Sequence, residues 1–103
     1  MKPTLLTLVI VALLGMFGAA QAGGNAGAGK AKAGSCAGCH GANGEGKAPN
    51  PALAGMKEDK FIQAMKDYKS GKRANPAMKM FAGQLNDQDT ENVAAYYASL
   101  KKK

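Results

Sequence analysis

The stretch Cys36-Ala37-Gly38-Cys39-His40 decides how the rest of this sequence is interpreted. It places two thiols three residues apart and an imidazole directly after the second thiol. The chain contains two cysteines and one histidine in all, so these five residues hold every one of them. Such a cluster indicates a cofactor site, a metal site or a redox-active thiol pair.

Several kinds of site contain two cysteines at this spacing. A thiol–disulfide redox motif normally lies in a βαβ unit, and no run of this sequence alternates apolar and polar residues as a strand does. A structural zinc site uses four nitrogen or sulfur ligands, whereas this chain offers three. A disulfide across so short a loop adds little stability. A lone histidine is more often an ordinary surface or core residue, but one directly after Cys-x-x-Cys favours covalent haem attachment.

We therefore expect one covalent haem c, with Cys36 and Cys39 bonded to its vinyl groups and His40 bound to its iron. The composition favours such a cofactor, because the chain has no Trp, three Tyr and three Phe in 103 residues. Small domains with so few large side chains usually need a disulfide, metal or cofactor to complete a core. This size excludes a multidomain enzyme, a coiled coil and a membrane channel.

The N-terminal stretch, residues 1–22, has the features of a secretory signal peptide. Lys2 precedes an uncharged apolar run, and the stretch ends in Ala20-Gln21-Ala22, a small-x-small cleavage signature. An uncleaved anchor is the alternative, since the uncharged run is long enough to span a membrane. The small residues at its end favour cleavage. We expect residues 23–103 to form a single monohaem domain in the periplasm, with no membrane span after cleavage.

The remaining sequence predicts an all-α domain. Helices are expected at residues 28–35, at 57–70, as a short turn at 76–81, and from an Asn86 cap onward. Residues 36–51 contain six Gly or Pro and are expected to form an irregular loop.

A second axial ligand for the iron is not settled by the residues alone. No second histidine exists, so a methionine, a lysine or an open position remains. Four methionines follow the signal peptide: Met56, Met65, Met78 and Met80. Met65 falls on the apolar face of a predicted helix, where Met is more often core.

Three segments together resemble the small bacterial class I c-type cytochromes. They are the Cys36–His40 motif, the stretch Arg73-Ala74-Asn75-Pro76-Ala77-Met78, and the closing helix that begins at Leu85-Asn86-Asp87. The resemblance is to the soluble kind called cytochrome c-553, which is similar to one half of the dihaem cytochrome c-4. It implies that Met78 is the axial ligand, with Met80 the alternative.

The same resemblance implies two further roles. A proline carbonyl in the loop after the haem motif orients the axial histidine, and Pro51 is preferred to Pro49 as the residue that supplies it for His40. Gly29 and the Tyr96–Tyr97 pair resemble the contact between the first and last helices of the family.

These features lead to the hypothesis of a soluble periplasmic one-electron carrier with a His/Met-ligated haem, not an enzyme, that shuttles electrons between respiratory redox partners. A haem sensor or small catalytic haem subunit with an open sixth position is the alternative. A thiol-redox or metal-carrier module that uses free Cys36 and Cys39 is a third hypothesis.

The formal net charge of +7 bears on the partners. Basic residues cluster at Lys57 and Lys60, at Lys66, Lys69, Lys72 and Arg73, and at residues 101–103. They favour redox protein partners with acidic docking surfaces. Nucleic acid is not expected, because the basic residues are not interleaved with aromatic ones. The single-domain size favours a monomer.

Overall fold

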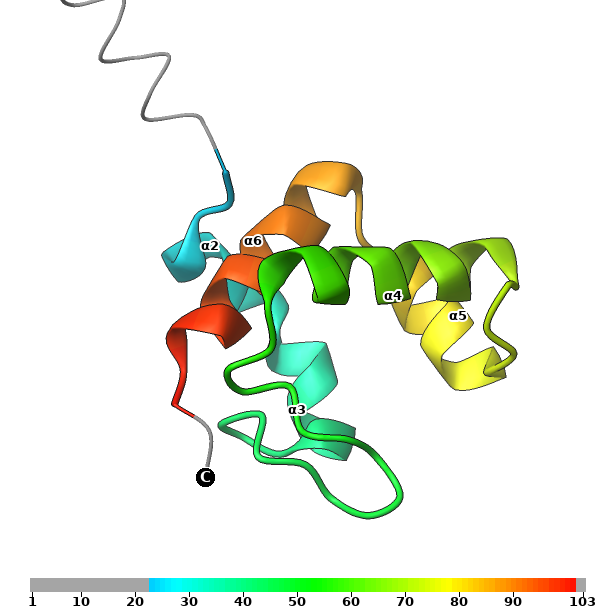
Figure 1. Cartoon of the computed structure of the whole chain (residues 1–103), viewed down its shortest axis with the longest axis horizontal. Helices are drawn as coiled ribbons and strands as arrows, with labels where there is room; N and C mark the ends of the chain where they lie inside the picture. The colour runs from blue at the N-terminus through cyan, green and yellow to red at the C-terminus, as the bar shows by residue number, and fades with distance from the viewer. Residues whose placement is uncertain (1–22, 102–103) are drawn as a thin grey trace, which may run out of the picture.

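A computed structural model describes residues 23–101 of the chain. Within these residues the chain forms only helices and connecting loops, apart from one isolated bridge between Lys47 and Asn50 (Figure 1). The helices are α2 (Ala26–Lys32), α3 (Gly34–His40), α4 (Glu58–Ser70), α5 (Pro76–Gly83) and α6 (Asp87–Ser99). The expectation of an all-α fold is confirmed. The expected signal peptide, residues 1–22, lies outside the described residues.

The boundaries of α4, α5 and α6 follow from local chemistry. Gly71 ends α4 with a φ of 83°, a left-handed conformation that favours glycine. The side chain of Asn75 caps α5. The side chain of Asn86 accepts the backbone N–H of Asp89, whose carboxylate accepts the Asn86 N–H in return. This capping box satisfies two N–H groups at the start of α6.

The prediction that an irregular loop begins at residue 36 is wrong. Cys36 to His40 belong to α3, which starts at Gly34 after a turn at Ala33. Most glycines and prolines of the segment lie beyond the motif, and the helix ends only at Gly41, where φ is 96°. The irregular loop therefore starts one residue after the histidine. Helix α5 also runs two residues beyond its expected end at residue 81.

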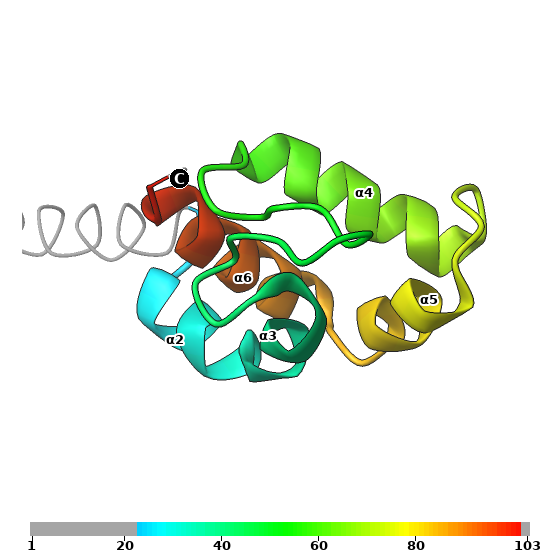
Figure 2. The same ribbon diagram turned by 90° about the horizontal axis from the view of Figure 1, so that it is seen from below.

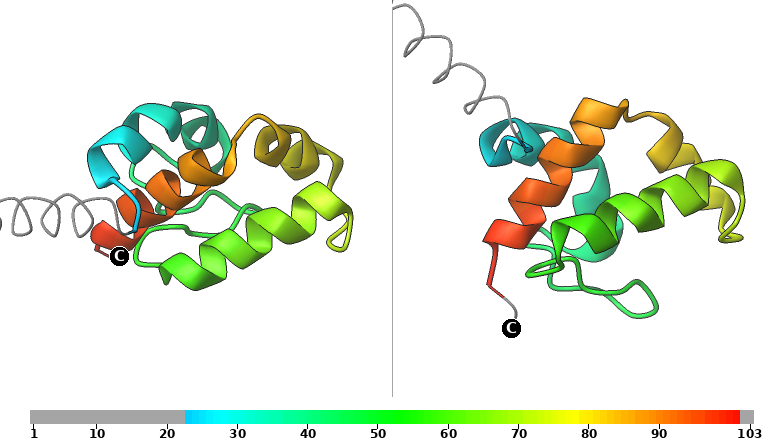
Figure 3. Two further views of the ribbon diagram at one scale, coloured as in Figure 1. Left: turned by 90° about the horizontal axis from the view of Figure 1, so that it is seen from above. Right: turned by 45° about the horizontal axis from the view of Figure 1, so that its top comes forward.

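The helices pack in two groups that share α6. Helices α2 and α6 lie side by side, α4 contacts α6, and α5 lies against the C-terminal part of α4 (Figures 1 and 3). The loop between α3 and α4 runs beneath α4 (Figure 2). The buried core between these elements includes Phe61, Leu85, Val93, Ala94 and Tyr97.

Helices α2 and α6 approach so closely that a side chain at Gly29 has no room. A Cβ atom built there would lie 1.9 Å from the backbone oxygen of Asn92. The crossing is therefore a backbone contact at Asn92. The expected close contact between the first and last helices at Gly29 is therefore present, and it is centred one turn before the tyrosine pair, of which Tyr97 packs against Phe61 and beside Gly44. The Asn92 side chain also accepts the Asn25 N–H at 2.8 Å, which secures the start of α2.

Replacing Gly29 by alanine is expected to destabilise the domain by about 1–3 kcal/mol, because the added methyl forces the two helix backbones apart. The matched control is Gly34→Ala, where no atom lies within 4 Å of the new Cβ. That change is expected to be neutral or to stabilise by up to about 1 kcal/mol through helix propensity. Denaturant unfolding of the haem-loaded protein measures both. Equal stability of the two variants contradicts the close crossing.

Candidate haem site

Helix α3 brings the three residues of the motif together on one side. Residues three and four apart are neighbours on a helix surface, so Cys36 lies beside both Cys39 and His40. The His40 side chain is buried, Cys36 is half-buried and Cys39 is exposed. Neither cysteine is paired in a disulfide. Two thiols at a surface with a buried imidazole beside them suit attachment of a cofactor edge.

A hollow of about 280 Å³ opens in front of these residues. Its lining comes from α3, the following loop, α4 and α5. Cys36, Cys39 and His40 line it from α3, whereas Ala77, Met78 and Phe81 line it from α5. Helix α4 lies over both α3 and α5 and contributes mainly apolar side chains, Phe61 and Met65 among them (Figure 2). The hollow is thus lined mostly by apolar groups, with a nitrogen donor on α3 and a thioether on α5.

The His40 ring is held by the loop that follows α3. Its Nδ1 lies 2.7 Å from the backbone oxygen of Pro51. An oxygen acceptor there places the proton on Nδ1 and leaves Nε2 with a free lone pair for a metal. Asn50 adds a second link, because its side-chain amide donates to the Cys39 carbonyl at 3.0 Å. Of the two prolines considered from the sequence, Pro51 makes this contact with the histidine.

The four candidate methionines differ in position. Met78, Met56 and Met65 all line the hollow, whereas Met80 does not and is 55% exposed. Of the two methionines on α5, only Met78 lines the hollow. Its backbone N–H donates to the Asn75 side chain at 3.0 Å. The structure therefore separates Met78 from Met80, two residues apart on one helix.

Arg73 is a lining residue whose position the sequence did not indicate. Its guanidinium carbon lies 4.7 Å from the centre of the Tyr68 ring, and both side chains line the hollow. Arg73 is the one permanently charged side chain among the lining residues. In the sequence it stood in a basic cluster and in the segment that resembles the family, and neither feature distinguishes a lining arginine from a surface one.

Tyr97 supports the site from behind α3. It is 1% exposed, and burial is the main cause that raises its pKa well above the ordinary value. Before haem attachment, burial likewise raises the pKa of the Cys36 thiol. A hydroxyl that stays neutral in the core keeps this side of the site free of charge.

The fold and the site define a small class I haem protein, with helices around one hollow and a haem-attachment motif on the second described helix. The family model for cytochrome c matches residues 25–101. The chain belongs to the cytochrome c family.

Similar proteins support this assignment. The chain is 45% identical to a cytochrome c4 of Pseudomonas aeruginosa, in an alignment that covers 98% of this chain and 50% of the relative. It is 41% identical to cytochrome c-554(548) of Halomonas halodenitrificans, over 74% of this chain and 96% of that one. The crystal structure of reduced recombinant cytochrome c4 from Pseudomonas stutzeri superposes with a TM-score of 0.72 and 36% identity, covering 78% of this chain and 47% of that one. The chain spans about half the length of these cytochrome c4 relatives.

The expected cofactor follows from this membership and fits the residues present. A cytochrome c domain with a Cys-x-x-Cys-His motif carries covalent haem c. The hollow offers what such a group needs: two thiols at its rim, an oriented imidazole, a thioether and apolar walls. The expectation of one covalent haem c is confirmed.

The raised pKa of Tyr97 predicts a specific loss of stability in alkali. Below about pH 10 the tyrosine is neutral in both folded and unfolded chains, so it adds no pH dependence. Above that pH the unfolded chain ionises first, and the free energy of unfolding falls by up to about 1.4 kcal/mol per pH unit. Tyr97→Phe is expected to make the free energy of unfolding fall less steeply with pH between pH 10 and 11.5. Denaturant unfolding of both proteins over this range measures the difference. Parallel pH curves for the two proteins contradict it.

Proposed function

We propose that this protein is a one-electron carrier whose haem iron is bound by His40 and Met78. The observation that carries the proposal is the arrangement around one hollow: His40 lines it from α3 with Nδ1 bound to Pro51, and Met78 lines it from α5. A histidine and a methionine on separate elements suit the two axial positions of one haem.

The chemistry of this donor set favours electron transfer over catalysis. Bound haem supplies an iron couple that accepts and releases one electron. A soft thioether opposite an imidazole favours the reduced iron and raises the reduction potential. Two protein ligands leave no axial position for a substrate, so we propose a carrier and not an enzyme. A sensor or catalytic subunit would instead have an open sixth position at the iron, and the ligand test below distinguishes the two alternatives.

The residues of this chain have separate tasks in the proposal. The Pro51 carbonyl fixes the tautomer and orientation of the His40 ring. Phe61 and the other apolar lining residues exclude water from the haem faces. The Arg73 guanidinium suits a carboxylate of bound haem, since arginine binds carboxylates with two parallel hydrogen bonds.

Substitution of single methionines tests the ligand. Met78→Ala is expected to abolish the weak far-red absorption band of ferric methionine ligation and to lower the reduction potential, because the thioether no longer binds iron. Met80→Ala is the matched control on the same helix and is expected to retain the band. Absorption spectra and voltammetry of the haem-loaded proteins provide the readouts.

Met56, another methionine that lines the hollow, tests the assignment from a second side. Met56→Ala is expected to retain the band as well. Loss of the band in Met56→Ala or Met80→Ala, with Met78→Ala unchanged, reassigns the ligand. A wild-type protein that lacks the band and binds carbon monoxide readily supports the open-position alternative and overturns the carrier proposal.

We further propose that residues 1–22 are a cleaved signal peptide and that residues 23–103 act in the periplasm as a single monohaem domain. The part of the chain that the structure describes contains no helix long and apolar enough to cross a membrane. Export of the domain agrees with its covalent haem, and the sequence signals at Ala20 to Ala22 set the cleavage site.

Mass spectrometry of the protein purified from an expression host with haem-maturation machinery checks this cleavage. The expected mass is that of residues 23–103 plus one haem. A mass that retains residues 1–22, with the protein in the membrane fraction, shows instead that the segment serves as an anchor.

The proposed partners are respiratory redox proteins with acidic docking surfaces. We propose that this protein binds them as a monomer. Lys69 is not part of the free basic surface, because it is half-buried and its Nζ donates to the Leu85 carbonyl at 2.5 Å. The exposed cations of α4, α5 and the turn between them are Lys60, Lys66, Lys72, Arg73 and Lys79. They lie on the elements that line the hollow and attract negative partners over a range set by salt.

Small redox reagents of opposite charge test this attraction. The rate of oxidation by ferricyanide is expected to fall as ionic strength rises from about 0.01 to 0.15 M, since salt screens the positive surface. The rate of reduction of the ferric protein by the cationic reagent hexaammineruthenium(II) is expected to rise over the same range. Stopped-flow absorbance measures both. Rates that do not respond to salt show that the basic residues do not govern access to the haem.

A further inference from the structure

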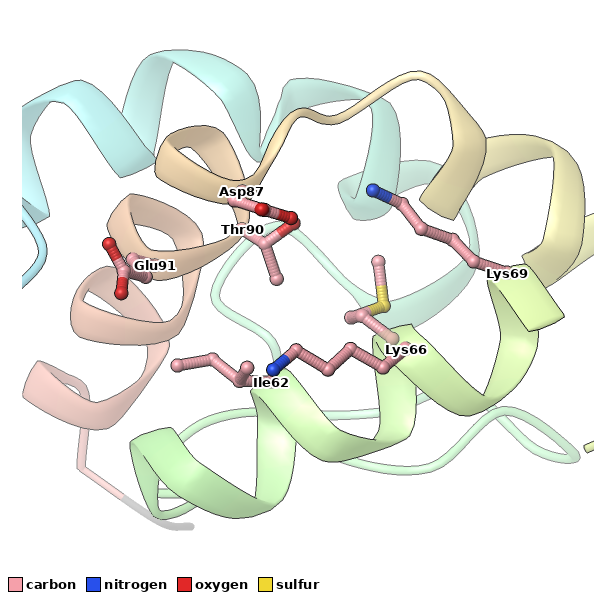
Figure 4. A pocket seen from close by; sticks show the side chains of 7 residues that line it. Ile62, Lys66, Lys69, Asp87, Thr90 and Glu91 are labelled. Carbon is pink, nitrogen blue, oxygen red and sulfur yellow. The ribbon is translucent and has the colours of Figure 1, made fainter. Parts of the chain in front are cut away.

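A second hollow lies on another side of α4, between that helix and α6. Its volume is about 140 Å³. Figure 4 shows Ile62, Lys66 and Lys69 of α4 facing Asp87, Thr90 and Glu91 of α6 across it. We call this hollow the α4–α6 crevice.

The crevice and the haem hollow differ in chemistry. Four of the seven residues that line the crevice are charged, namely Lys66, Lys69, Asp87 and Glu91. A polar hollow of this volume has room for several water molecules and offers them hydrogen-bond partners. The haem hollow is lined mainly by apolar side chains. A polar space and an apolar one therefore lie close to the same helix.

Met65 is the residue that lines both spaces. Its side chain is 3% exposed and belongs to the buried core. None of the other six crevice residues lines the haem hollow. Ile62, one turn earlier on α4, lines the crevice alone.

We propose that Met65 is the barrier that keeps the water of the α4–α6 crevice out of the haem hollow, and that it thereby holds up the reduction potential. Water beside the haem stabilises the more highly charged oxidised iron and lowers the potential, because burial and polarity are main determinants of that potential. This inference rests on the proposed carrier function. It gives Met65 a positioning role in addition to its packing, since it acts by excluding solvent and not by binding iron.

Truncation and conservative replacement of Met65 separate this role from simple packing. Met65→Ala removes three heavy atoms and is expected to lower the reduction potential and to speed oxidation of the reduced protein by air several-fold. Met65→Leu keeps most of the volume and is expected to stay close to wild type in both. Ile62→Ala, the matched control, enlarges the crevice without joining it to the haem hollow. It is expected to reduce stability while the potential is unchanged.

Voltammetry, the far-red band and the rate of air oxidation are measured on each haem-loaded protein. An unchanged potential in Met65→Ala, or an equal shift in Ile62→Ala, overturns the barrier. If Met65→Ala fails to fold, Met65→Val is measured, and an unchanged potential there overturns the barrier equally. Loss of the far-red band in Met65→Ala overturns it too, by showing that Met65 binds iron. A wild-type protein without the band instead marks failure of the carrier proposal.

Discussion

The hydrogen bond between His40 Nδ1 and the Pro51 carbonyl joins α3, the helix that carries the haem-attachment motif, to the loop that follows it. It fixes the ring at the end of α3 and holds the long loop against that helix. The Asn50 amide reinforces the link at the Cys39 carbonyl. Without this loop the imidazole would lack an orienting acceptor, and one wall of the hollow would be missing. The geometry of the haem site therefore depends on a contact between residues eleven positions apart.

The rest of the fold holds this unit in position. The backbone contact of Gly29 with Asn92 packs α2 against α6, and α3 follows α2 after a single turn residue. Tyr97 of α6 packs beside Gly44 in the loop, and its hydroxyl contacts Cys36. Helix α6 thus contacts both the segment that carries the thiols and the loop that orients the histidine. The close crossing and the buried tyrosine have an indirect effect on the haem through this packing.

Helix α4 separates two environments of opposite character. One side faces the apolar hollow, and another faces a crevice with charged walls. Large aromatic side chains are few in this chain, so the apolar layer around a cofactor is only about one residue thick. Met65 holds that place on α4, and Met78 extends the apolar lining on α5. The proposed carrier therefore has few side chains between its cofactor and solvent.

The sequence by itself determined the cofactor, the all-α class, the bounds of α4 and the starts of α5 and α6, because these depend on local chemistry: the spacing of Cys36, Cys39 and His40, and caps such as Asn86. The helix expected at residues 28–35 instead spans residues 26–32. It misjudged where the loop begins, since counting glycines over a window does not locate the helix end. Only the tertiary structure decided that Met78 lines the hollow while Met80 is exposed, that Gly29 meets Asn92, and that Arg73 lines the site. These facts depend on how separate helices meet, and packing between distant segments leaves no local pattern in the sequence.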